Sequence, residues 1–277
     1  MRELAGQTVL LTGASGGLGG SIARAFARLG TKLVLVAYPE TGLDRVRQEV
    51  ELCGSPALSL ASDLRDPEQR RGVVGQATRE FGSVDILVNN AGVELTTPYH
   101  ELTEQNIRDV ISINLEAAMV LTRLVLPGML ARGSGHIVNI SSLAGKMGPA
   151  FQEPYAATKA ALVAFTASLR ATYRGSGVSA STVVPAFLEA GIYARLKAQS
   201  GCAAPAFLAG NTPENAAQAV LRAIREDRPE IIVNRYPIRP ALAFAVLAPR
   251  LAEWICARLG VDQFFRRAVA ARKRVPL

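Results

Sequence analysis

The sequence is poor in cysteine and histidine, the side chains that most often form disulfides and hold structural metals. It has three cysteines and two histidines in 277 residues. The cysteines, at positions 53, 202 and 256, are odd in number and lack the close spacing of metal ligands. Such a set is typical of a reducing compartment, and no secretory signal pattern follows Met1. We therefore expect a cytoplasmic protein without a metal site.

Long apolar runs are also scarce. The nearest candidate for a membrane span, Ala241 to Leu259, is interrupted by Pro249, Arg250, Glu253 and Arg258. It therefore predicts a pair of helices or a segment lying on a surface rather than a span. The motifs of common nucleic-acid-binding modules are missing as well. Since 49% of the residues are hydrophobic and 19% are charged, the chain is expected to fold around a large core.

The chain is basic, with a formal net charge of +8. Part of the excess lies near the end, in Phe264 to Arg267 and Arg272 to Arg274. The end is either a solvated basic segment or a surface for an anionic partner. An apolar segment with a cationic flank can lie on an anionic membrane, but it can equally pack on the core, cover the substrate mouth or join subunits. We therefore leave peripheral membrane contact open and expect no nucleic-acid partner.

Short, mostly β-branched runs alternate with longer segments of helical periodicity up to about residue 233. Runs that are apolar on both faces are typical of strands in a parallel sheet covered by helices. We therefore predict an α/β fold with a doubly wound, seven-stranded parallel sheet and helices on both faces. The predicted strands are Val9–Leu11, Leu33–Val36, Ala57–Leu60, Ile86–Val88, Ile137–Ile140, Ser181–Val184 and Ile231–Val233.

The domain organisation follows from the same alternation. Residues 1–235 are expected to form one dinucleotide-binding and catalytic domain. Pro237 and Pro240 mark the junction to residues 236–277, an apolar and basic helical extension rather than an independent domain.

A glycine-rich loop joins the first predicted strand to the first predicted helix. It reads Thr12-Gly13-Ala14-Ser15-Gly16-Gly17-Leu18-Gly19. Glycines let the backbone approach phosphates closely, and the helix N-terminus supplies free N–H groups and a favourable dipole. In this position the loop predicts a binding site for the pyrophosphate of a dinucleotide.

The spacing Thr-Gly-x-x-x-Gly-x-Gly resembles the cofactor loop of the short-chain dehydrogenase/reductase family, which has a Rossmann-type fold. Asp63 and the motif Asn89-Asn90-Ala91-Gly92 match that family's adenine-side residues in the same register. The resemblance implies an NAD(P) cofactor and a small-molecule substrate. The cofactor contacts that it implies are Gly13, Ser15, Gly16, Gly17, Leu18, Gly19, Ala37, Tyr38, Asp63, Leu64, Asn90, Ala91, Gly92, Tyr155, Lys159, Pro185, Ala186 and Leu188.

Tyr155 and Lys159 lie one helical turn apart, so they share a face. A nearby ammonium lowers the pKa of a phenol, so we expect Lys159 to lower the pKa of Tyr155 and make it a proton donor or acceptor. Ser142 follows a predicted strand whose carboxyl end faces the ligand crevice. With Asn114, these residues resemble the family's catalytic tetrad, in which the serine holds the substrate oxygen and the asparagine fixes a water near the lysine.

Two segments depart from the family's pattern. Pro185-Ala186-Phe187-Leu188-Glu189-Ala190 has alanine where a glycine and a carboxamide-binding threonine are usual, so a looser contact with the nicotinamide is expected. At the end of the second strand, Ala37 stands near the acid of NAD-dependent relatives and Tyr38 where NADP-dependent relatives carry arginine. The sequence therefore leaves NAD against NADP open.

The remaining predictions concern the substrate and the surface. The stretch from Phe187 to Leu208 is expected to form an apolar lid, with Lys146 and Met147 nearby, which favours a lipophilic substrate. The helix from Tyr155 to Tyr173 predicts a homo-oligomer by analogy with the family, through a flat face of small residues made of Ala156, Ala157, Ala160, Ala161, Ala164 and Phe165. We interpret the protein as an NAD(P)-dependent oxidoreductase acting on a carbonyl or secondary alcohol. The alternatives are a dinucleotide-binding regulator without turnover and a sugar-nucleotide epimerase or dehydratase.

Overall fold

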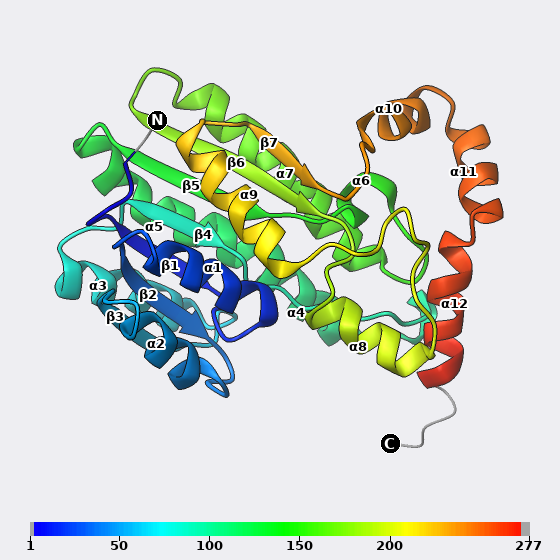
Figure 1. The fold of residues 1–277 in the computed structure, drawn as a ribbon, viewed down its shortest axis with the longest axis horizontal. Helices are drawn as coiled ribbons and strands as arrows, with labels where there is room; N and C mark the ends of the chain where they lie inside the picture. Colours follow the sequence, from blue (N-terminus) through cyan, green and yellow to red (C-terminus); the bar gives the residue numbers. More distant parts are fainter. Residues whose placement is uncertain (1–2, 273–277) are drawn as a thin grey trace.

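The computed structural model describes residues 3–272, and these form a layered α/β structure with a helical arm at one side (Figure 1). Lys273 and Arg274, part of the basic end, lie outside the described residues. The central sheet has seven parallel strands in the order β3-β2-β1-β4-β5-β6-β7. The strands are β1 (Thr8–Thr12), β2 (Lys32–Ala37), β3 (Ala57–Ala61), β4 (Ile86–Asn89), β5 (Gly135–Ile140), β6 (Val178–Pro185) and β7 (Glu230–Val233). The predicted fold and all seven predicted strands are confirmed.

The strand order reverses next to β1, where the chain crosses from the β1–β2–β3 half of the sheet to β4. In register, Leu11 of β1 lies between Leu35 of β2 and Val88 of β4. Side chains such as Leu11 and Leu35 are fully buried because helices cover both faces of the sheet. Parallel sheets of this type bind ligands in the crevice outside the carboxyl ends of the strands, at such a switch point.

Two groups of helices cover the sheet, one on each face, and each buries its own apolar core. One face is covered by α1 (Gly17–Ala27), α2 (Leu43–Glu51) and α9 (Pro213–Arg225). The other face is covered by α3 (Pro67–Phe81), α5 (Ala117–Ala131) and α7 (Glu153–Thr172). Shorter elements complete the body: η1 (Tyr99–Glu101), α4 (Glu104–Ile111), the π-helical turn η2 (Ser112–Glu116), α6 (Ala144–Met147) and α8 (Gly191–Ser200).

A third apolar cluster joins the lid to the end of the chain. The extension forms α10 (Arg239–Leu247), α11 (Pro249–Arg258) and α12 (Val261–Arg272), and Figure 1 shows α10 and α11 standing away from the sheet while α12 runs beside α8. Val261, Phe264, Phe265, Ala268 and Val269 form a buried stripe along α12 at helical spacing. The segment from Phe264 to Arg267 is therefore no solvated basic end. Its phenylalanines are buried and its two arginines lie exposed on the outer face.

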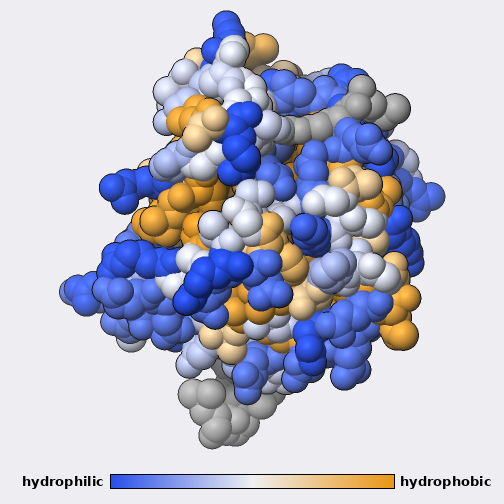
Figure 2. All heavy atoms as spheres, turned by 90° about the vertical axis from the view of Figure 1, so that its left-hand side faces the viewer, coloured by the Kyte–Doolittle hydropathy of each residue, from blue (hydrophilic) through white to orange (hydrophobic). Residues whose placement is uncertain are grey.

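Apolar length and composition single out one described stretch as long enough to cross a membrane, and it is Glu104–Ala131 rather than Ala241 to Leu259. It comprises α4, η2 and α5, which pack against α3, α7, β4 and β5. Core helices of soluble proteins pass the same test, so this stretch is weak evidence for a span. Polar and charged side chains cover most of the face shown in Figure 2, with smaller apolar areas between them.

Candidate active site

A cavity of about 1010 Å³ opens at the carboxyl ends of the strands and extends from the glycine loop to the lid and the C-terminal helices. Every residue that we expected to contact the cofactor lines it, and Ser142, Lys146 and Met147 line it too. The volume is at the upper end of the range for small-molecule sites, which suits a long cofactor with a substrate beside it.

The glycine loop is shaped by close backbone contacts. Gly13 has a positive φ of 65°, and a Cβ at this residue would lie 2.9 Å from the Cα of Ala91. The side-chain Nδ2 of Asn90 donates to the carbonyl oxygens of Thr12 at 3.0 Å and Gly13 at 3.1 Å. Gly16 caps α1 without any side-chain hydrogen bond. The first turn of α1 therefore presents backbone N–H groups to the cavity, in a cradle with no room for side chains, which fits a pyrophosphate.

The other end of the cavity collects the residues expected near the adenosine. Ala37 ends β2, and Tyr38 is exposed beside it. The carboxylate of Asp63 accepts from the Arg65 guanidinium at 2.7 Å, which lowers the pKa of Asp63. Arg65 also contacts Asp109 at 3.4 Å. Arg65 lines the cavity and was missed by the sequence analysis; its place directly after Asp63 and Leu64 was the available signal.

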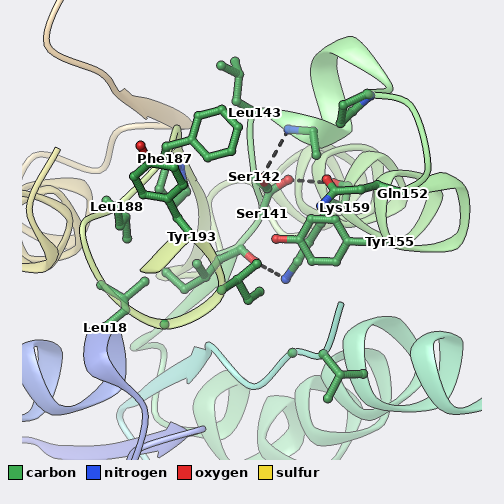
Figure 3. Close-up of a pocket in the computed structure, with 18 of the residues that line it drawn as sticks. Leu18, Ser141, Ser142, Leu143, Gln152, Tyr155, Lys159, Phe187, Leu188 and Tyr193 are labelled. Atoms are coloured by element: carbon green, nitrogen blue, oxygen red, sulfur yellow. Dashed lines mark hydrogen bonds between the residues drawn. The ribbon is translucent and has the colours of Figure 1, made fainter. Parts of the chain in front are cut away.

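Tyr155 lies at the centre of the cavity with its hydroxyl directed toward the space between Ser142 and the lid (Figure 3). Tyr155 lies in the first turn of α7, directly after Pro154. Its hydroxyl is hydrogen-bonded with Ser142. Ser142 follows the end of β5, and its Oγ accepts from the backbone N–H of Ala144 at 3.2 Å. The structure therefore brings a phenol and a hydroxyl from separate segments to one point.

Lys159 is held below Tyr155 by backbone contacts. Its Nζ donates to the carbonyl oxygen of Ile140 at 2.9 Å and lies 5.6 Å from the centroid of the Tyr155 ring. The Oγ of Ser141 donates to the backbone carbonyl of Lys159 at 2.7 Å, which ties β5 to α7. Ser141 is thus a structural neighbour of the site, while Ser142 faces the cavity.

The pKa of Tyr155 differs from our expectation. Burial raises it to about 12, its hydrogen bond with Ser142 opposes this, and the charge of Glu94 raises it further. Burial also lowers the pKa of Lys159 to about 8. The expected net lowering of the Tyr155 pKa is therefore wrong for the protein by itself, because burial sets the direction of the shift and the Lys159 ammonium is directed at the carbonyl oxygen of Ile140.

Asn114 does not line the cavity itself but holds the backbone of Val93, which does. It lies in the π-helical turn η2, a feature that is frequent at functional sites. Its Oδ1 accepts from the N–H of Val93 at 2.8 Å, and its Nδ2 donates to the carbonyl of Val93 at 2.9 Å. A Cβ on Gly92 would lie 3.3 Å from the Lys159 Nζ and 3.4 Å from the Asn114 Oδ1. All four residues of the predicted tetrad therefore lie together.

The segment after β6 closes the phosphate end of the cavity. Ala186 donates its N–H to the carbonyl of Val233 at 3.0 Å. Ala190 stands where the family carries threonine. It lies so close to Gly17 that a Cβ added to Gly17 would be 2.9 Å from the Cβ of Ala190. The small residue therefore packs against the glycine loop and leaves no side-chain hydrogen bond there.

The substrate end of the cavity has an apolar wall, although Lys146, Glu253 and Asp262 also line the cavity. Figure 3 shows Phe187, Leu188 and Tyr193 opposite Ser142 and Tyr155. The ring of Phe187 lies 4.9 Å from that of Tyr193 and 5.4 Å from that of Phe264. Val261 and Phe265 of α12 line the cavity as well, and so do Val246, Ala252 and Cys256 of the arm. The sequence analysis left open that the extension covers the substrate mouth, but it did not name Phe264 and Phe265 for this role because it took them as part of a basic end.

Comparison with known proteins agrees with this geometry. The family model described as short chain dehydrogenase matches residues 7–201. The chain is 40% identical over 248 residues to the ketoacyl reductase HetN of a Nostoc species, covering 90% of this chain and 85% of that one. It is 36% identical over 187 residues to the 3-oxoacyl-[acyl-carrier-protein] reductase FabG of Vibrio cholerae, covering 68% and 75%. A metagenomic short-chain oxidoreductase solved with NADP is 32% identical, with a TM-score of 0.72 and coverage of 84% and 98%.

The chain therefore belongs to the short-chain dehydrogenase family. It is an NAD(P)-dependent oxidoreductase that acts on a small-molecule substrate. The predicted nicotinamide cofactor is confirmed at the level of the class, and the choice between NAD and NADP stays open.

Proposed function

We propose that this enzyme interconverts an apolar ketone and the corresponding secondary alcohol, with Tyr155 as the proton donor or acceptor. The observation that carries the proposal is one continuous cavity, which has the glycine loop at one end, the Tyr155–Ser142 pair in the middle and an apolar wall at the other end. The ketoacyl reductases among its relatives support the same chemistry.

The residues present fit a dinucleotide. The loop from Gly13 to Gly19 would hold the pyrophosphate, and the segment from Pro185 to Leu188 would lie beside the nicotinamide. When bound, the cofactor supplies or accepts the hydride. The protein's own contribution is to orient the substrate and move a proton.

In the reduction direction, the Ser142 hydroxyl holds the carbonyl oxygen of the substrate, and the Tyr155 hydroxyl donates its proton to that oxygen as negative charge develops. Because the pKa of Tyr155 is about 12, the phenol is protonated at neutral pH and ready to donate. Lys159 places a positive charge below the ring and stabilises the phenolate that remains. Asn114 keeps Val93 and the start of the following loop in place.

An apolar substrate is favoured by the wall opposite Tyr155. Phe187, Leu188, Ile192, Leu196 and Leu208 of the lid face the cavity, and none of them carries a charge. Such a wall gains free energy by covering apolar surface of the ligand.

The test is a panel of ketones, β-keto esters and matching alcohols of increasing chain length, followed by absorbance of the reduced cofactor. We expect kcat/KM to rise with chain length, and Tyr155→Phe to lower kcat by about 10²–10⁴-fold while the Kd for NADPH stays within about threefold. Cofactor binding without turnover across the panel would favour the regulator, and unchanged turnover in Tyr155→Phe would remove the proposed acid.

The arm formed by α10 and α11 is proposed to touch a membrane surface, in an otherwise cytoplasmic enzyme. Val246 and Leu247 are 80% and 84% exposed, and Trp254 is 55% exposed with Arg258 4.6 Å above its ring. Exposed apolar side chains beside arginines suit an anionic bilayer. We expect the protein to sediment with acidic liposomes at low salt and the double variant Leu247→Asp/Trp254→Asp to stay in solution. Equal sedimentation of both would contradict this contact.

Self-association is proposed through α7. Ala157, Ala160 and Ala164 are exposed on its outer face, whereas Ala156 faces inward and does not belong to that surface. Small side chains let helices of two copies approach closely. Sedimentation velocity should show a dimer or tetramer that Ala164→Arg dissociates, and an unchanged mass in that variant would place the interface elsewhere.

A further inference from the structure

A buried carboxylate outside the predicted tetrad joins three parts of the substrate end. Glu94 lies in the loop after β4, and its side chain is 1% exposed. Its carboxylate accepts from the Arg195 guanidinium at 2.9 Å, from the Gln152 Nε2 at 3.3 Å and from the Thr96 hydroxyl. A carboxylate buried to this extent needs such partners, because the loss of one leaves an uncompensated charge.

The contact with Gln152, and the chain segment next to Glu94, belong to the frame that holds the catalytic residues. Gln152 comes directly before α7 and lines the cavity three residues ahead of Tyr155. The N–H and the carbonyl oxygen of Val93, the neighbour of Glu94, are both hydrogen-bonded to the side-chain amide of Asn114. The position of Glu94 is therefore fixed by the same groups that set the geometry around Tyr155.

The contact with Arg195 crosses to the lid. Arg195 lies on α8, whose residues Ile192, Tyr193 and Leu196 face the cavity. The other ion pair of α8 in residues 3–272 joins Lys197 to Glu189 at 3.2 Å and stays within the lid itself. Arg195 is thus the charged link from α8 to the body of the protein, across 101 positions in the sequence.

We propose that the Glu94–Arg195 ion pair latches helix α8 over the substrate, with Glu94 as the positioning residue that ties the closed lid to the Tyr155 frame. A substrate enters when α8 moves outward and is held against Tyr155 when Arg195 returns to Glu94. The half-exposed guanidinium regains water contacts when it leaves, whereas the buried carboxylate is left uncompensated and draws it back. The assignment of a substrate role rests on the proposed function.

Hydrogen–deuterium exchange of the full chain with NADPH bound tests the latch without any turnover. In Arg195→Met we expect amide exchange in residues 191–200 to rise at least fivefold, while Arg195→Lys restores most of the protection. Lys197→Met is the matched control. It also removes a positive charge from α8, but the partner of that charge, Glu189, lies within the lid itself. Exchange in Arg195→Met within twofold of the wild type, or an equal rise in Lys197→Met, would overturn the latch.

A double-variant cycle separates the pair from general loosening. Once Arg195 is replaced, adding Glu94→Gln should leave the exchange of residues 191–200 unchanged, because the interaction is already lost. A further rise of fivefold or more in the double variant would show that the two residues act independently. If Glu94→Gln does not fold, the exposed Arg195 and Lys197 variants still decide the question.

Kinetics with ethyl 3-oxohexanoate give the second readout. Arg195→Met should raise the KM for this ester about tenfold, with kcat within twofold and the Kd for NADPH unchanged, since the latch acts on substrate retention. An equal loss in kcat, or a changed Kd for NADPH, would contradict a lid-specific role. Absence of turnover in the wild type across the whole panel would count against the proposed function, and the exchange experiment would then decide the latch alone.

Discussion

Gly19 faces the carbonyl oxygen of Gly13 so closely that a Cβ on Gly19 would lie 2.1 Å from that oxygen. The contact packs the first turn of α1 against the loop that precedes it. It therefore sets the position of the N–H groups that are expected to meet the pyrophosphate. Gly19, the last glycine of the loop, serves helix packing rather than flexibility, because it carries no positive φ.

Replacing Gly19 with alanine should destroy the phosphate cradle. The added methyl group meets backbone, which cannot move aside like the end of a side chain, so we expect the Kd for NADPH to rise at least about 100-fold by isothermal titration. Gly75→Ala is the matched control, because Gly75 lies in α3 with nothing within 4 Å of a new Cβ. That change should leave the Kd unchanged and raise the free energy of unfolding by about 0.5–1 kcal/mol.

The second prediction concerns the choice of cofactor at the end of β2. An aspartate at position 37 would repel a 2′-phosphate and bond the ribose hydroxyls of NADH. We expect Ala37→Asp to raise the ratio of the Kd for NADPH to the Kd for NADH by at least about tenfold. Ala37→Asn has the same shape without the charge, so its ratio should stay within about threefold of the wild type. A ratio that Ala37→Asp leaves unchanged would place the ribose away from Ala37.

The fold and the residues that gather at the candidate site were predictable because local signals and the resemblance to the family pointed to them. The strands are short β-branched runs between helical periods, and the glycine loop, Ser142 and the Tyr155–Lys159 pair follow fixed spacings within one segment each. Contacts between distant segments gave no such signal. The Glu94–Arg195 pair spans 101 positions, and no spacing rule joins a loop acid to a lid arginine.

Burial explains the other differences. The pKa of Tyr155 depends on how completely the ring is enclosed, which the positions of Tyr155 and Lys159 alone do not reveal. The stripe from Val261 to Val269 was readable at helical spacing, but the neighbouring arginines favoured a solvated end. That this stripe packs on the lid, rather than on the sheet or a second copy, follows only from the tertiary structure.

The third prediction tests α12 as a wall of the substrate pocket. Phe265 is 2% exposed and contacts both the lid and the cavity. We expect Phe265→Ala to lower the free energy of unfolding by about 3 kcal/mol in denaturant titration and to raise the KM for long ketones. Leu247→Ala, on the exposed arm, should change stability by less than about 0.5 kcal/mol. A loss below about 1 kcal/mol for Phe265→Ala would mean that α12 packs only loosely on the lid.

The last prediction concerns pH and rests on Lys159, whose buried ammonium has a pKa of about 8 instead of its usual 10.5. As the pH rises through about 8, Lys159 loses its charge and with it the attraction that stabilises bound cofactor and phenolate. Because kcat/KM for NADPH reports the ionisations of the free enzyme, it should be level below pH 8 and fall about tenfold per pH unit above it. Lys159→Arg keeps its charge over this range, so its kcat/KM should not fall above pH 8, even though its overall rate is lower.

The free energy of unfolding should change with pH in the opposite direction. A lysine whose folded pKa is lowered costs free energy of folding while it is protonated, so that cost is present below pH 8 and disappears as the pH rises toward 10.5. The raised pKa of Tyr155 acts only above pH 10, where it lowers stability, so the window from pH 8 to 10 reports Lys159. In the activity profile, a fall in kcat/KM above pH 8 that persists in Lys159→Arg would assign the ionisation near pH 8 to another group.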